Sequence, residues 1–261
     1  MADIITEQSE SILRVVLNRP AKKNAMTSGM YAALADVFND AAKDKRIRVV
    51  LWHGAGDSFC AGNDVEDFLK NPPGPGASPQ AQLMNALNDF DKPLVAAVQG
   101  AAIGGGTTML THCDFVYAGE SAKFQMPFVN LAVVPEFGSS FLVPARIGHI
   151  RAAELILLGL SFDAKRAADL GFVTQVVSDQ ILLATATETA RKLAAKPAGA
   201  LQASKRLMKR SFREQIKAAM KAENEEFSAQ VRSDDAKEAL TAFLEKRAPD
   251  FTRTVKSATA A

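Results

Sequence analysis

Short apolar runs rich in β-branched residues alternate with helical patterns along the first 180 or so residues. The apolar runs are ILRVVL (12–17), RVVLWHG (48–54), LVAAVQG (94–100) and DFVYAG (114–119). Between and after them, apolar residues recur three to four positions apart, which predicts helices at 28–43, 80–90 and 151–159. Because strands separated by helices favour parallel pairing, the alternation predicts an α/β fold built around a parallel sheet.

The pattern changes in the last third of the chain, where 198–247 is helical with charges on one face. We therefore divide the chain into a core at 1–197 and a C-terminal helical region at 198–261. An apolar stripe at helical spacing marks this region: Leu201, Met208, Phe212, Ile216, Met220 and Phe227. The stripe either packs inside the same chain or, in part, against a neighbouring subunit, and the sequence leaves both alternatives open.

Composition excludes several classes of function. A net charge of +2 over 261 residues gives no electrostatic sign of a nucleic-acid partner. No run approaches the roughly 18 apolar residues of a membrane span, and the N-terminus has no apolar signal segment. Cys60 and Cys113 form neither a disulfide framework nor a metal motif, and the three histidines lack metal-ligand spacing. We expect a cytoplasmic protein that needs no metal and binds no membrane.

Three consecutive glycines, Gly104 to Gly106, lie between an apolar run and a helical pattern in GAAIGGGTTMLTHCDF (100–115). The lysine of a phosphate-binding P-loop is missing here, and FGSSF (137–141) does not match a nucleophile elbow. Free N–H groups at the start of a helix can stabilise an oxyanion. Alternatively, the glycines only allow a helix and a strand to pack closely.

A second glycine-containing segment, DSFCAGNDV (57–65), also follows a buried strand. Together with LNRPAKKNAM (17–26), KPLVAAVQGAAIGGG (92–106), CDFVYAG (113–119) and the segment from 122 to 177, it resembles the crotonase superfamily of enoyl-CoA hydratases, enoyl-CoA isomerases and relatives. The resemblance spans roughly residues 4–210. It implies a spiral of ββα units, followed by C-terminal helices that help to form homotrimers or dimers of trimers.

The resemblance also implies an acyl-CoA substrate and locates its binding groups. The backbone amides of Asn63 and Gly105 match the oxyanion hole that holds the thioester oxygen in this family. Coenzyme A, as part of the substrate, would lie along Ala61, Gly62, Asp64 and Val65. Lys22 and Lys23 match positions where the family often keeps basic residues near the CoA phosphates, although exposed loop lysines are often only solvated.

Two positions argue against hydration of a double bond. Thr108 and Phe128 occupy the sites where the hydratase pattern has its two glutamates. Both would instead contribute to the substrate pocket, and Phe128 would make it drier. Syn addition of water needs groups that orient and deprotonate the water, which these side chains cannot supply.

One carboxylate remains nearby, Glu136, which follows a proline as the base does in the peroxisomal-type Δ3,Δ2-enoyl-CoA isomerases that this stretch resembles. Apolar neighbours should raise its pKa, which suits proton shuttling. Alternatively, Glu136 caps the helix that starts near Gly138. We therefore expect an enoyl-CoA isomerase without metal or redox cofactor. A hydratase, another crotonase activity and a non-catalytic acyl-CoA-binding protein are the alternatives.

Overall fold

The computed structural model describes residues 2–71 and 78–252, and within these ranges the largest element is a six-stranded sheet. The strand order is β1-β2-β3-β4-β6-β9, and each neighbouring pair is parallel except β1 and β2. The predicted α/β fold with a parallel sheet is confirmed, and β1 adds an antiparallel edge strand that the sequence pattern did not indicate. The strands are β1 (Ile4–Ser9), β2 (Ile12–Leu17), β3 (Val49–Gly54), β4 (Leu94–Val98), β6 (Phe115–Gly119) and β9 (Gln175–Val177).

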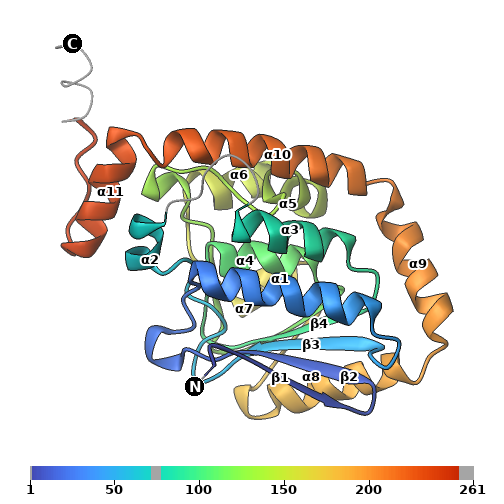
Figure 1. Cartoon of the computed structure of the whole chain (residues 1–261). Helices are drawn as coiled ribbons and strands as arrows, with labels where there is room; N and C mark the ends of the chain where they lie inside the picture. Colours follow the sequence, from blue (N-terminus) through green and yellow to red (C-terminus); the bar gives the residue numbers. More distant parts are fainter. Residues whose placement is uncertain (1, 72–77, 253–261) are drawn as a thin grey trace.

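Helices cover both faces of this sheet (Figure 1). Helix α8 packs on one face, and α1 and α3 lie on the other, with α10 above them. The helices are α1 (Ser28–Lys43), α2 (Val65–Lys70), α3 (Pro79–Asp89), α4 (Gly105–Thr108), α5 (Ser139–Ile147), α6 (His149–Leu157), α7 (Ala164–Asp169), α8 (Asp179–Ala194), α9 (Ala198–Arg210), α10 (Arg213–Gln230) and α11 (Asp234–Leu244). Short 3₁₀ turns are η1 (Pro20–Lys22), η2 (Met109–His112) and η3 (Val129–Leu131).

The central strands are apolar throughout because both of their faces are covered. Every residue of β4 is buried, as is usual for a strand inside a parallel sheet. On the α8 side, Val49 and Val95 pack with Ala186 and Ala190, whose spacing puts them on one helical face. The small alanines let α8 approach the sheet closely.

A second, three-stranded sheet within the described residues gives the chain its spiral form. It contains β5 (Ala101–Ile103), β7 (Lys123–Gln125) and β8 (Phe162–Asp163), and an isolated bridge from Cys60 to Ala102 continues it. The chain passes from β4 to β5 to α4, and later from β6 through β7 to α5. Each passage is a strand of the large sheet, a short strand of the small sheet and then a helix, as expected for ββα units.

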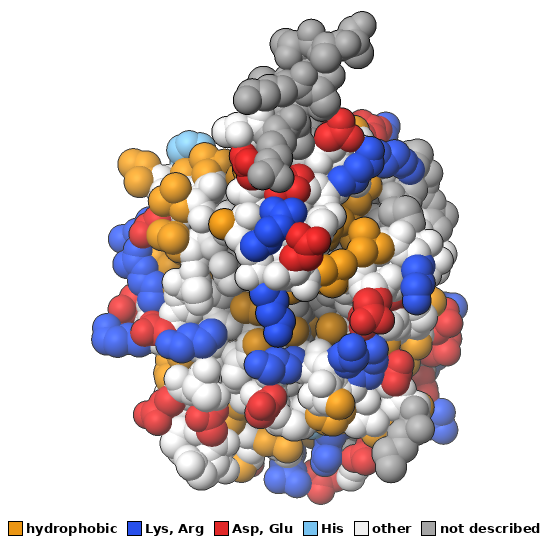
Figure 2. Space-filling view, turned by 90° about the vertical axis from the view of Figure 1, so that its left-hand side faces the viewer, with side chains coloured by type: hydrophobic (Ala, Val, Ile, Leu, Met, Phe, Trp, Pro, Cys, Tyr) orange, Lys and Arg blue, Asp and Glu red, His pale blue; other side chains and the backbone are white. Residues whose placement is uncertain are grey.

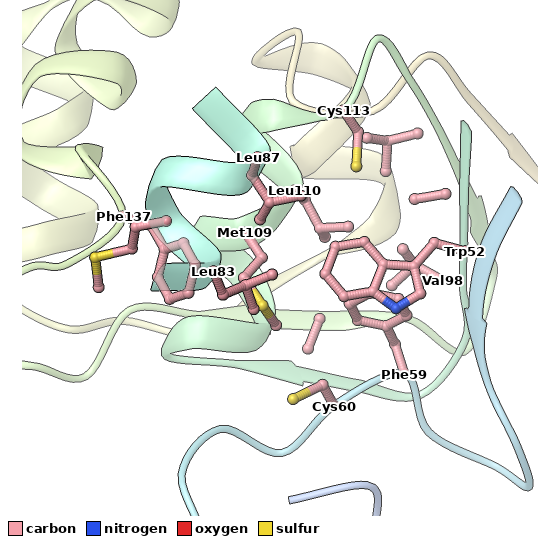
Figure 3. Close-up of a cluster of buried hydrophobic side chains, with 14 of the residues drawn as sticks. Trp52, Phe59, Cys60, Leu83, Leu87, Val98, Met109, Leu110, Cys113 and Phe137 are labelled. Carbon is pink, nitrogen blue, oxygen red and sulfur yellow. The ribbon is translucent and has the colours of Figure 1, made fainter. Parts of the chain in front are cut away.

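Aromatic packing fixes the core beneath the glycine-containing segments. Trp52 makes edge-on contacts with Phe38 and Phe59, with ring centroids 5.4 and 5.7 Å apart. Figure 3 shows Trp52 and Phe59 among neighbouring buried side chains, with Cys60 and Phe137 at the border of the group. Burying such rings contributes about 1.5–3 kcal/mol each. The core therefore anchors residues that immediately adjoin the segments of functional interest.

The apolar stripe of the C-terminal region divides into two parts. Ile216, Met220 and Phe227 on α10 are buried in the main core, so this part packs inside the chain. Met208 and Phe212 are 76% and 48% exposed, so the single chain leaves much of their surface uncovered. In the ranges that the structure describes, no helix has both the length and the apolar character needed to cross a membrane.

Candidate active site

Backbone hydrogen bonds bring the two glycine-containing segments together. Cys60 donates its N–H to the carbonyl of Ala101, and Ile103 donates to the carbonyl of Cys60, at 2.9 Å each. A Cβ on Gly106 would collide with the carbonyl oxygen of Cys60, so only glycine permits this approach. The close-packing alternative therefore applies to Gly106, and the contact sets Gly105 beside the 60–64 segment.

The N–H group of Asn63 is directed away from its neighbouring strand partner. Met26 pairs with this segment by donating to the carbonyl of Gly62 and accepting from the N–H of Asp64. In such a parallel bridge, the residue between the two bonded ones points its own N–H to the opposite side. The side chain of Asn63 is held separately, because the Tyr31 hydroxyl donates to its Oδ1 at 2.6 Å.

Gly105 is the first residue of α4, where backbone N–H groups have no partner within the helix. It is buried, and it lines the same cavity as Asn63. A Cβ on Gly105 would lie 2.9 Å from Oε1 of Glu136 and 3.2 Å from the Tyr31 hydroxyl. The predicted base and the predicted backbone donor thus lie side by side in the structure.

Glu136 is a buried acid with an unsatisfied oxygen. Its side chain is 5% exposed, and among the described residues Oε1 has no hydrogen-bond partner. Burial, together with a smaller effect of the nearby charge of Glu223, raises the pKa of Glu136 to about 8. A carboxyl group with a pKa in this range can both accept and return a proton near neutral pH.

The turn that carries Glu136 is held from two sides. Phe137 has a φ of 61°, which is unusual for a bulky residue and needs support from its surroundings. His112 supplies part of it by donating from Nε2 to the carbonyl of Phe137 at 2.8 Å. Burial is the main cause that lowers the pKa of His112 to about 3, so this imidazole is neutral.

Glu223 of α10 supplies the rest of the support. Its carboxylate accepts hydrogen bonds from the N–H groups of Gly138 at 2.7 Å and Ser140 at 2.8 Å, at the start of α5. An acid at a helix N-terminus is stabilised by the unpaired N–H groups and the helix dipole. Glu223, and not Glu136, therefore caps this helix, which leaves the Glu136 side chain free for another role.

A cavity of about 370 Å³ surrounds these groups. Its wall is largely apolar, and the C-terminal helices contribute Phe227, Leu240 and Phe243. Figure 2 views the molecule from the side of α2 and α11, where apolar side chains gather among basic and acidic ones. Seven of the residues singled out from the sequence line this cavity: Ala61, Gly62, Asn63, Val65, Gly105, Phe128 and Glu136.

Two other candidate residues lie away from the cavity lining and have structural partners. The Thr108 hydroxyl is buried and donates to the carbonyl of Gly104 at 3.3 Å, because α4 turns this side chain into the protein. Asp64 caps α2 by accepting from Asp67 N–H and pairs with Arg19 at 3.0 Å. Burial opposes ionisation of Asp64, but these hydrogen bonds outweigh it and lower the pKa.

The paired lysines lie on the surface beside the 60–64 segment. Lys22 and Lys23 are both exposed, and neither side chain lines the cavity. The carbonyl of Lys23 accepts the N–H of Ala61 at 2.9 Å, so the backbone of this pair supports the segment. Their side chains are in solvent, where a charged ligand could reach them.

Sequence reasoning missed Tyr31 and Glu223. A signal for Glu223 was present, because it lies three residues after Met220 and four before Phe227, on the apolar face of its helix. An acid at that position must find buried partners. Tyr31 gave no comparable signal, because a tyrosine on the apolar face of a helix is ordinary core material.

Comparisons with known proteins point to a single family. The enoyl-CoA hydratase/isomerase family model matches residues 7–254. The chain is 35% identical to a 1,2-epoxyphenylacetyl-CoA isomerase of Escherichia coli, covering 97% of this chain and 99% of the relative. It is 36% identical to the enoyl-CoA hydratase EchA19 of Mycobacterium tuberculosis, covering 95% and 96%.

A solved structure extends the similarity to three dimensions. The enoyl-CoA hydratase/isomerase of Pseudoalteromonas atlantica superposes with a TM-score of 0.91 at 39% identity, covering 96% of this chain and 100% of that one. The similarity thus extends over nearly the whole chain. The chain belongs to the enoyl-CoA hydratase/isomerase family of the crotonase superfamily.

Proposed function

We propose that this acyl-CoA-processing enzyme is an isomerase that moves the double bond of a 3-enoyl-CoA to the 2 position. The observation that carries the proposal is the set of acids in the cavity. Among the described residues that line it, Glu136 is the one carboxylate. Proton transfer within a substrate needs one base, whereas syn hydration needs more than one group to position and activate water.

In the proposed reaction, Glu136 acts twice: it forms a single enolate intermediate by removing a proton, and it then protonates that intermediate. Its carboxylate takes the proton from C2 of the 3-enoyl thioester, and the electrons move onto the thioester oxygen. The N–H groups of Asn63 and Gly105 bind that oxyanion, as preorganised donors do in many acyl-transfer sites. Glu136 then returns the proton to C4, and the double bond forms between C2 and C3, so nothing is gained or lost.

The apolar surroundings of Glu136 support this division of roles. Phe128 and Val133 line the cavity and are at most 8% exposed. An environment of this kind disfavours charge on the free carboxyl and strengthens any interaction with a developing oxyanion. Among the described residues that line the cavity, no second carboxylate is present to orient and activate an attacking water.

Two substrates test the proposal directly. We expect 3-hexenoyl-CoA to gain the ultraviolet absorbance of a conjugated thioester, and crotonyl-CoA to keep its absorbance because no water is added. Glu136→Gln should lose most isomerase turnover while it still binds acyl-CoA. Rapid hydration of crotonyl-CoA would instead establish a hydratase, and binding without turnover of either substrate would favour an acyl-CoA-binding protein.

The aromatic content of the cavity favours a second candidate function. Phe68, Phe128, Phe227 and Phe243 all line it, and aromatic side chains pack well against a ring in the acyl group. The similar Escherichia coli protein is named as an isomerase of 1,2-epoxyphenylacetyl-CoA. The second candidate function is therefore isomerisation of a ring-bearing acyl-CoA by the same base. The ultraviolet assay described for 3-hexenoyl-CoA tests it when phenyl-substituted acyl-CoA substrates are used.

Two further parts of the proposal concern binding and assembly. The CoA portion would lie along Ala61, Gly62 and Val65, with Lys22 and Lys23 near its phosphates. A homotrimer or a dimer of trimers would cover apolar side chains that the single chain exposes, such as Ile150 at 85%. Light scattering coupled to size-exclusion chromatography measures the assembly, and a monomer would contradict it.

A further inference from the structure

Tyr31 is a buried side chain close to Asn63, Gly105 and Glu136 of the candidate site. It lies on α1, its side chain is fully buried, and its hydroxyl donates to Oδ1 of Asn63 at 2.6 Å. The same hydroxyl and Oε1 of Glu136 lie 3.2 and 2.9 Å from the position of a Cβ on Gly105. A single hydroxyl thus lies beside both residues of the oxyanion hole and beside the base.

The Tyr31 hydroxyl donates its single proton in a hydrogen bond to Asn63. Burial, and then the charge of Glu136, raise the pKa of Tyr31 well above its usual value, so the phenol keeps its proton. A phenol has one proton to donate. That proton goes to Asn63, and Oε1 of Glu136 has no hydrogen-bond partner among the described residues. Tyr31 therefore acts on the carboxamide and leaves the base free.

This hydrogen bond sets the orientation of the Asn63 carboxamide. An asparagine carboxamide is planar, with an accepting oxygen and a donating NH₂ group on either side of its Cβ–Cγ bond. With Tyr31 bound to the oxygen, the NH₂ group is the part that remains for a ligand. Asn63 lines the acyl cavity, and the bridge from Met26 to its flanking residues fixes its backbone.

We propose that Tyr31 is a positioning residue that holds the Asn63 carboxamide with its NH₂ group toward the acyl thioester, where it acts as a third N–H donor. This inference rests on the proposed enolate chemistry. Two backbone donors bind the oxyanion, and the carboxamide adds a donor that was not required by the family resemblance. Because the donor is preorganised, it stabilises the charged intermediate more than the neutral substrate.

A double-mutant cycle tests the coupling. Tyr31→Phe removes the hydroxyl but keeps the ring against Phe137, whose centroid is 6.4 Å away. Asn63→Ala removes the carboxamide but keeps the backbone N–H. We expect each single variant to lower kcat for 3-hexenoyl-CoA about tenfold with little change in KM, since one hydrogen bond contributes about that factor. The double variant should be no slower than Asn63→Ala alone.

The other tyrosine of the chain provides a matched control. The hydroxyl of Tyr117 lies 2.7 Å from the hydroxyl of Thr189, and Tyr117 belongs to the core cluster under α8, away from the site. Tyr117→Phe therefore removes a similar hydroxyl and should leave kcat unchanged. Circular dichroism and melting temperature confirm that every variant is folded, and a loss of kcat in Tyr117→Phe equal to that in Tyr31→Phe would overturn the proposal.

Exchange of the C2 proton of hexanoyl-CoA with D₂O, followed by NMR, gives a readout of enolate formation that does not depend on isomerisation. If the wild type exchanges this proton but leaves 3-hexenoyl-CoA unchanged, the isomerase assignment fails. The double-mutant cycle of Tyr31 and Asn63 is then measured with the rates of C2-proton exchange instead of kcat. Additive effects of the two substitutions, or a Tyr31→Phe variant with wild-type rates, overturn the role of Tyr31. A wild type without either activity overturns both proposals.

Discussion

Replacing Glu136 with glutamine keeps the shape of a buried side chain while it removes a group that titrates. The ordinary pKa of a glutamate, 4.5, describes Glu136 in the unfolded chain, and the folded value is about 8. Below pH 4.5 the Glu136 carboxyl is protonated in both the folded and the unfolded chain, so no charge on Glu136 opposes folding. Between these values the folded protein keeps a proton that the unfolded chain has lost.

The free energy of unfolding of the wild type must therefore fall as pH rises through this window. Each unit of pKa difference corresponds to about 1.4 kcal/mol, so the whole window corresponds to about 5 kcal/mol. Glutamine carries no charge at any pH, so the Glu136→Gln variant does not experience this loss. We expect the variant to match the wild type near pH 4.5 and to be more stable by several kcal/mol at pH 9.

Urea unfolding at pH 5, 7 and 9, followed through the fluorescence of the single tryptophan, Trp52, measures this difference. Glu226→Gln provides the control, because Glu226 lies on the same α10 that carries Glu223 but is exposed to solvent. Its stability relative to the wild type should change little with pH. A Glu136→Gln advantage that is the same at all three pH values would refute the conclusion that burial raises the pKa of Glu136.

Three further predictions follow from the site. The kcat/KM for isomerisation should rise with pH and level off above about 8, since the base works when ionised; a profile flat from pH 6 to 9 would contradict this. Glu223→Gln should shift that profile to lower pH, because a negative charge beside Glu136 is lost. It should also destabilise the fold by about 1–3 kcal/mol, because the N–H group of Gly138 or Ser140 loses its acceptor. An unshifted profile would rule out an effect of the Glu223 charge on the pKa of Glu136. Gly105→Ala should lower kcat at least tenfold, because the Cβ of the new alanine displaces the flexible end of the Glu136 side chain. The melting temperature should stay close to that of the wild type. An unfolded variant would show that the contact between Gly105 and Glu136 is structural.

The parallel part of the fold could be predicted from the sequence because its central strands are locally unambiguous. β3 and β4 are buried on both faces, so their apolar runs have no competing interpretation. β1 was missed because it is an edge strand with four exposed residues, and its polar sequence resembles a loop. The local sequence pattern did not show the strands of the small sheet, because they have only two or three residues and pairing between distant segments creates them. Only the ββα spiral implied by the family resemblance pointed to them.

The sequence pattern alone indicated two glycine-containing segments, and the family resemblance then singled out Asn63, Gly105 and Glu136. The structure brings these three residues to one cavity. Thr108 and Asp64 were harder, because which way a side chain turns on a short helix depends on tertiary contacts. No local pattern could show that the cap of α5 comes from Glu223, which is more than 80 residues away along the chain.

The cavity is built by two parts of the chain with different tolerance to change. The donors on Asn63 and Gly105 are main-chain groups fixed by the spiral itself, so ordinary side-chain replacements leave them in place. Phe227, Leu240 and Phe243 lie on α10 and α11, which close the cavity from outside the spiral. Substitutions on these two helices can therefore reshape the space for the acyl chain while the charge-stabilising groups stay constant, which lets one scaffold acquire new substrates through its C-terminal end.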